Sequence, residues 1–188
     1  MTFENFWCGV YFGSSDLTDT KKVREFGVKD GEFPCVVLDA TNNLCVIWQK
    51  NIEQTPSGGR EWWSSRFDGT NWSEPYRLAS FVGPYKFDIN LPSFIIDPTT
   101  NIGYVVFEWR DRFINGPNSH LYLGWFSINN PLDIQFTELE YAPNPTRCEF
   151  PSINQGGNYL YIAFQREDKI FRIKWDIVNH HKITVMIW

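Results

Sequence analysis

The segment Glu32–Trp48, EFPCVVLDATNNLCVIW, decides the fold because it recurs twice further along the chain. The later copies are Asn90–Trp109, NLPSFIIDPTTNIGYVVFEW, and Glu149–Phe164, EFPSINQGGNYLYIAF. Each copy places a proline after a bulky apolar residue, then a short apolar run, a polar turn and a second run rich in aromatic residues. The three prolines are 58 and 59 residues apart. A fixed period with matching positions predicts a repeat architecture.

The composition favours a single all-β domain. The chain has 188 residues, of which 18% are aromatic, with 9 Trp, 13 Gly and 11 Pro, as suits many short strands joined by turns. The net charge of −5 and the lack of a Lys/Arg cluster argue against nucleic acid or an anionic membrane as partner. The N-terminus does not resemble a signal peptide, and no apolar run is long enough to span a membrane. By default we expect a cytoplasmic chain.

Each repeat is expected to contain four strands, separated by polar turns. For the first repeat these are residues 34–40, 44–49, 60–67 and 72–79, with Pro75 in an outer edge strand. The repeats span residues 34–80, 92–141 and 151–188, and residues 1–33 form a partial unit of two strands. Four strands at a regular spacing are typical of β-propeller blades, with each proline just ahead of an innermost strand. A β-sandwich is the alternative, but it does not require equal positions in every repeat.

The string Ser65–Trp72, SRFDGTNW, followed by Ser-Glu-Pro, resembles the Asp-box turn of sialidase-like and related lectin propellers. The aspartate is shifted by one position relative to that motif, and the other two repeats lack the motif. The resemblance covers three repeats and implies a propeller. It implies structural roles for Asp68, Gly69 and Trp72, on the rim away from any ligand. In such a turn the aspartate binds the turn backbone and the tryptophan packs between blades.

Three blades do not close a ring, because familiar propellers have about 4 to 8. Two arrangements would complete the ring. Two copies of the chain could form a homodimer of six blades, or the chain could join other blades of a larger propeller. An isolated monomer of three blades is the least favoured state, since unpaired blades would expose apolar faces.

Ligands of propellers usually meet the end built from the loops between blades and the loops between second and third strands. Glu32 and Glu149 recur two residues before their prolines, and Asp88 precedes the second. These three carboxylates are the candidate catalytic residues. Charged or hydrogen-bonding residues of the same loops are the candidate ligand-binding residues: Tyr85, Arg110, Asp111, Arg112, Arg147 and Arg166.

Two interpretations of these residues compete. A glycosidase would use two carboxylates as acid and base or nucleophile, with arginines holding an anionic group. The resemblance to sialidases implies an arginine triad, but the chain carries Glu-Phe-Pro and Asn-Leu-Pro where sialidases carry Arg-Ile-Pro. The other interpretation is that the charges are solvated loop ends and ion pairs between blades. Likewise Trp62, Trp63 and Trp109 are either sugar-stacking platforms or core residues.

Other chemistry is not indicated. The four cysteines and three histidines show no metal-ligand spacing, and no metal or cofactor is expected. Cys35 and Cys45 lie on neighbouring predicted strands, so a disulfide and two buried free thiols are both open. The predicted function is a non-catalytic binding module for a carbohydrate or protein ligand. The alternatives are a sialidase-like glycoside hydrolase, or a subunit of one, and a purely structural propeller piece.

Overall fold

The computed structural model describes residues 9–12, 21–25, 31–39, 41–51, 59–68, 70–82, 87–111, 118–128, 130–143 and 146–187. Within these ranges the chain forms strands and turns, which confirms the all-β expectation. No helix that is long and apolar enough to cross a membrane occurs in this described part. The N-terminal pair consists of β1 (Gly9–Phe12) and β2 (Lys21–Glu25), which are antiparallel.

Three four-stranded antiparallel sheets follow, and in each the strands are ordered as they occur in the chain. The first sheet contains β3 (Gly31–Leu38), β4 (Leu44–Asn51), β5 (Gly59–Phe67) and β6 (Tyr76–Val82). The second contains β7 (Phe87–Ile96), β8 (Ile102–Asp111), β9 (Ser119–Ser127) and β10 (Asn130–Ala142). The third contains β11 (Glu149–Gly156), β12 (Tyr159–Arg166), β13 (Lys169–Asp176) and β14 (His181–Ile187).

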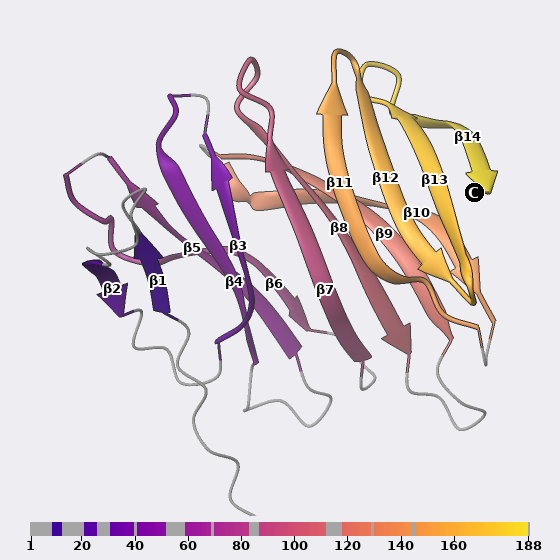
Figure 1. Ribbon diagram of the computed structural model, residues 1–188, viewed down its shortest axis with the longest axis horizontal. Coiled ribbons are helices and arrows are strands. Elements are labelled where there is room, and N and C mark those ends of the chain that lie inside the picture. The colour runs from indigo at the N-terminus through magenta and orange to yellow at the C-terminus, as the bar shows by residue number, and fades with distance from the viewer. Residues whose placement is uncertain are drawn as a thin grey trace, which may run out of the picture.

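The first strands of the three sheets are neighbours in space. Figure 1 shows β7 between β3 and β11, and β7 contacts both of them. The described strands form an open row of three sheets and do not close into a ring.

The second sheet is buried on both faces. Toward the first sheet, Phe107 and its neighbours pack with Ile47 and Trp62, and the Trp62 and Phe107 rings meet edge to face at 5.0 Å. Toward the third sheet, Val106 packs in a cluster that includes Ile162 and Trp175. Successive residues of a strand point to opposite faces, so a sheet packed on both sides needs an unbroken apolar run. That requirement explains the run from Tyr104 to Phe107.

The repeat extends to an identical irregularity in every first strand. The register with the second strand shifts between Glu32 and Cys35, between Asn90 and Ser93, and between Glu149 and Ser152. Each shift spans one of the repeated prolines. The expectation that Pro92 and Pro151 precede their strands is therefore wrong, since they lie inside β7 and β11, and Pro34, expected at the start of its strand, lies inside β3. Those strands are sheet edges, and a bulge at an edge accommodates a residue that has no backbone N–H to donate.

The fourth strand of the first sheet also begins later than expected. β6 starts at Tyr76, so Pro75 precedes it, and Trp72 forms only an isolated bridge with Phe67.

The cysteines are resolved as free thiols at Cys35, Cys45 and Cys148. In the β3–β4 register Cys35 lies opposite Ile47 and Cys45 opposite Val37, so the two cysteines of this hairpin are not directly paired.

Candidate functional site

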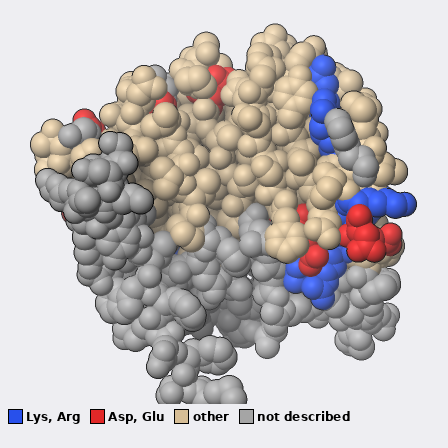
Figure 2. Space-filling model, viewed as in Figure 1, with Lys and Arg blue, Asp and Glu red and all other residues tan. Residues whose placement is uncertain are grey.

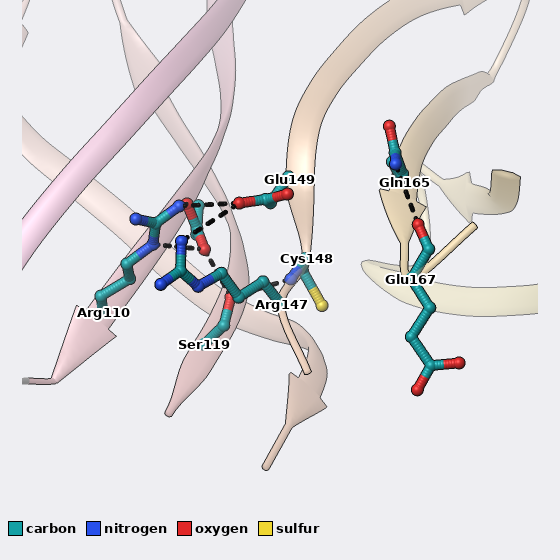
Figure 3. A network of polar contacts seen from close by, with 8 residues as sticks. Arg110, Ser119, Arg147, Cys148, Glu149, Gln165 and Glu167 are labelled. Atoms are coloured by element: carbon teal, nitrogen blue, oxygen red, sulfur yellow. Dashed lines mark hydrogen bonds and ion pairs between the residues drawn. The ribbon is translucent and has the colours of Figure 1, made fainter. Parts of the chain in front are cut away.

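Three of the predicted site residues meet at the junction of the second and third sheets. Arg110 lies near the end of β8, Glu149 begins β11, and Arg147 belongs to the segment just before it. Arg110 Nη2 lies 3.2 Å and Arg147 Nη1 3.5 Å from Glu149 Oε1, so the two arginines converge on one carboxylate (Figure 3). The Arg110–Glu149 pair joins strands of two sheets through residues that are 39 positions apart in sequence.

A fourth residue, Glu108 of β8, holds Arg110 in place. It was not predicted from the sequence. Its side chain is 0% exposed, and Arg110 contacts both of its oxygens through Nε and Nη2 at 2.7 Å. Ser119 Oγ donates to Glu108 Oε1 at 2.7 Å and accepts from the Cys148 backbone N–H at 2.9 Å. Aligning the repeats would have pointed to Glu108. It pairs with Asn90 in the second sheet, and the equivalent pairs in the other two sheets are Glu32–Gln49 and Glu149–Gln165.

The charges of this network compensate one another, since two arginines face two carboxylates. The neighbouring Cys148 thiol adds no nucleophile, because burial and the nearby Glu140 carboxylate raise its pKa to about 12. We call Glu108, Arg110, Arg147 and Glu149 the junction network. Figure 2 shows the described Lys and Arg side chains of this view gathered over the right-hand half of the molecule, which includes the third sheet.

Arg166, predicted in the same set, lies apart from the junction network. Its Nη1 pairs with Glu140 of β10 at 2.9 Å, and its guanidinium carbon lies 4.3 Å from the centroid of the Phe171 ring. Glu140 is also 3.7 Å from Lys182 Nζ of β14. Arg166 therefore ties the third sheet to the outer strand of the second.

The turn residues of the first sheet occupy a different place. Asp68 Oδ1 accepts the backbone N–H groups of Thr70 and Asn71 at 2.8 Å, as a turn aspartate does. Trp72 packs with Val46, Trp48 and Trp63 on the face of the first sheet that points away from the second. Trp62, in contrast, is fully buried between the first two sheets.

The remaining predicted residues are only partly covered by the structure. Gly69, Tyr85 and Arg112 lie outside the described residues. For Glu32, Asp88 and Asp111 only the backbone is described, in β3, β7 and β8. In the β7–β8 register Asp88 lies opposite Arg110.

A second group, which we call the aromatic cluster, lies at the same end of the second sheet. It consists of Trp109, His120, Tyr122 and Tyr141 with the carboxylate of Glu138. The His120 and Tyr141 rings are 5.0 Å apart and the Trp109 and Tyr122 rings 5.2 Å apart. Glu138 Oε2 accepts from Tyr122 Oη at 3.3 Å and lies 3.4 Å from His120 Nδ1.

The aromatic cluster combines aromatic rings with a hydrogen-bonding carboxylate on the face of the second sheet that points toward the first, where Trp109 and Tyr122 also pack against the core. Tyr141 is 46% exposed. Burial and the Glu138 carboxylate raise the pKa of Tyr122, so its hydroxyl stays protonated at neutral pH and keeps its hydrogen bond to Glu138. Of these residues Trp109 was considered from the sequence as a sugar platform, and His120 was considered only as a metal ligand and set aside. The cluster was missed because its members come together through the pairing of β9 with β10.

Among the described residues, no group of three or more His, Cys, Asp or Glu side chains is arranged to hold a metal ion. No protein-family model matches the chain, and no curated protein is significantly similar to it.

Proposed function

We propose that this chain is a non-catalytic recognition module built on a propeller-type scaffold. The observation that carries the proposal is the junction network, in which Arg110 and Arg147 both lie on Glu149. A glycosidase needs a carboxylate that can exchange a proton or attack a sugar, with room for the substrate beside it. Glu149 is instead held by two arginines, and Arg110 is already occupied by Glu108. The network thus supports an ion-paired link between sheets rather than a reaction centre.

The test is hydrolysis of a panel of fluorogenic glycosides, including sialosides, by the wild-type chain and by Glu149→Gln. We expect no turnover above the rate without protein in either case. Asp168→Asn, an exposed turn position, serves as the charge-matched control. Turnover that disappears in Glu149→Gln and persists in Asp168→Asn would establish the glycosidase alternative and overturn the proposal.

The ligand that the surface supports best is a carbohydrate at the aromatic cluster. Flat ring faces suit the C–H groups of a pyranose, and carboxylates such as Glu138 commonly accept sugar hydroxyl groups. Binding is measured by calorimetry after a glycan array has identified a candidate. Tyr141→Ala should weaken it at least tenfold, whereas Tyr161→Ala, a half-buried tyrosine of the third sheet, should not. Equal affinity of wild type and Tyr141→Ala would exclude this surface as the sugar site.

We further propose that additional sheets pack at the open ends of the row. Val36 and Leu38 of β3 are each 52% exposed, and Ile170 and Met186 are exposed on the outward face of the third sheet. Apolar residues in such positions are usual at contacts between blades or subunits. A second copy of the chain is the simplest partner, and other blades of a larger propeller are the alternative. Light scattering should give a mass of twice 22.1 kDa for the dimer, and a stable monomer would refute it.

A further inference from the structure

A groove of about 430 Å³ lies at the opposite end of the strands from the junction network. It runs between the turn that joins β7 to β8 and the hairpin that joins β11 to β12. Its walls include Asp97, Pro98 and Thr99 from the turn, and Asn154, Gln155 and Gly157 from the third sheet. The volume is within the range of small-ligand sites.

The groove contains a buried carboxylate. Asp97 is only 5% exposed, and its Oδ1 accepts the backbone N–H groups of Thr99 at 2.8 Å and Thr100 at 3.4 Å. Burial raises the pKa of Asp97, but hydrogen bonds from Thr99, the Gln155 side chain and Thr100 outweigh it and hold the pKa below its usual value. The carboxylate is therefore charged at neutral pH.

The first sheet has an aspartate at the same position, directly after its first strand, in a turn that is one residue shorter, and it shows what such a carboxylate binds. Asp39 is 3% exposed, and its Oδ1 accepts the backbone N–H groups of Thr41 and Asn43 at 2.8 and 2.9 Å. Its Oδ2 lies 2.6 Å from Arg66 Nη2, and the same nitrogen donates to Thr41 Oγ1 at 2.7 Å. The turn thus presents a carboxylate and a threonine to one guanidinium group.

The second sheet keeps the aspartate at this position but lacks the arginine. Arg66 pairs with Cys45 in the β4–β5 register, and Trp125 occupies the equivalent place opposite Tyr104 in the β8–β9 register. Trp125 stacks on His180 and packs against the third sheet. Among the described residues, no Lys or Arg lies within ion-pair distance of Asp97. Hydrogen bonds from the turn and from Gln155 stabilise the Asp97 carboxylate, but no described cation neutralises its charge. Buried carboxylates of this kind concentrate at functional sites.

We propose that the groove binds a guanidinium group, which would supply to Asp97 the partner that Arg66 supplies to Asp39. A planar guanidinium suits a carboxylate better than an ammonium does, because it donates from two nitrogens at once. Pro98 and the neighbouring Ile95 provide apolar surface for the methylene groups of an arginine side chain. The ligand is therefore an arginine side chain of a peptide, or a small molecule with the same group. The site is separate from the aromatic cluster and does not depend on it.

The test titrates the wild-type chain with Nα-acetyl-arginine amide and with its neutral citrulline counterpart, and follows the backbone amide resonances of Thr99 and Gly157. We expect saturable shifts with the arginine compound only. A capped Ala-Arg-Ala peptide provides the second arm. Tenfold tighter binding of the peptide identifies a protein segment as the ligand, and equal binding identifies a free guanidinium compound. A lysine analogue that binds as tightly would overturn the preference for guanidinium.

Two matched variants locate the site. Asp97→Asn keeps an oxygen that can cap the turn and should weaken binding at least tenfold. Asp39→Asn makes the same change in the equivalent turn and should leave the affinity unchanged. Equal losses in both variants, or equal binding of citrulline and arginine compounds by the wild type, would refute the proposal. The citrulline comparison needs no variant, so it remains decisive if Asp97→Asn folds poorly.

Discussion

Replacing Arg110 with methionine should destabilise the chain far more than replacing Arg147. Arg110 is the only described cation on Glu108, whose side chain is 0% exposed, so Arg110→Met leaves a buried carboxylate uncompensated. Breaking a buried pair in this way costs about 3–5 kcal/mol. Arg147 is 46% exposed, and its ion pair within the described part of the chain is with Glu149, at 3.5 Å. A pair of that kind contributes about 0–1 kcal/mol.

The assay is urea unfolding followed by tryptophan fluorescence, with Arg147→Met as the matched control. In thermal unfolding these losses of unfolding free energy correspond to a Tm drop of roughly 6–20 °C for Arg110→Met and of a few degrees at most for Arg147→Met. A second change isolates the cause. Glu108→Gln in the Arg110→Met background should recover most of the loss, because glutamine is the residue at the equivalent positions of the other two sheets. Equal losses for the two arginine variants, or no recovery in the double variant, would refute the reasoning.

Three further predictions follow from burial and turn geometry. Gly103→Ala should cost about 1–3 kcal/mol in urea unfolding, since its Cβ would lie 2.6 Å from Cζ of the buried Phe126 ring; an unchanged midpoint would show that the ring can move. Burial raises the pKa of Asp39 and of Asp97, but turn hydrogen bonds lower both overall, so the unfolding free energy should fall as pH drops from about 5 to 2. The Asp39→Asn variant should flatten that slope. Finally, the fully buried Cys148 should resist a thiol reagent at pH 8 until the chain is unfolded, as peptide mapping would show.

The repeat period was enough to predict the sheets, because it fixes where strands and turns alternate. The repeated prolines define the period, but the sequence did not predict the bulges that let these prolines lie inside β3, β7 and β11. A bulge depends on the register with the neighbouring strand, which the sequence alone does not specify. Glu108 was missed for a related reason: it sits at the end of an apolar run, and only the pairing with β9 places Ser119 beside it. Ion pairs between blades were among the interpretations of the loop charges, yet their partners came only from the packing of two sheets.

The outward face of the third sheet constrains how the row can be extended. At the places where the second sheet has the buried Leu123 and the half-buried Trp125, the register of the third sheet puts Arg172 and Lys174. These two cations lie over the rings of half-buried tyrosines, 5.4 and 3.8 Å from the ring centroids. The charged groups themselves lie on the ring faces in cation–π contacts, so this face carries positive charge that an all-apolar blade face does not. A sheet that packs there must remove water from both cations, which is costly unless it brings carboxylates of its own. Assembly through this face should therefore weaken as salt is added, whereas assembly through Val36 and Leu38 of β3 should not.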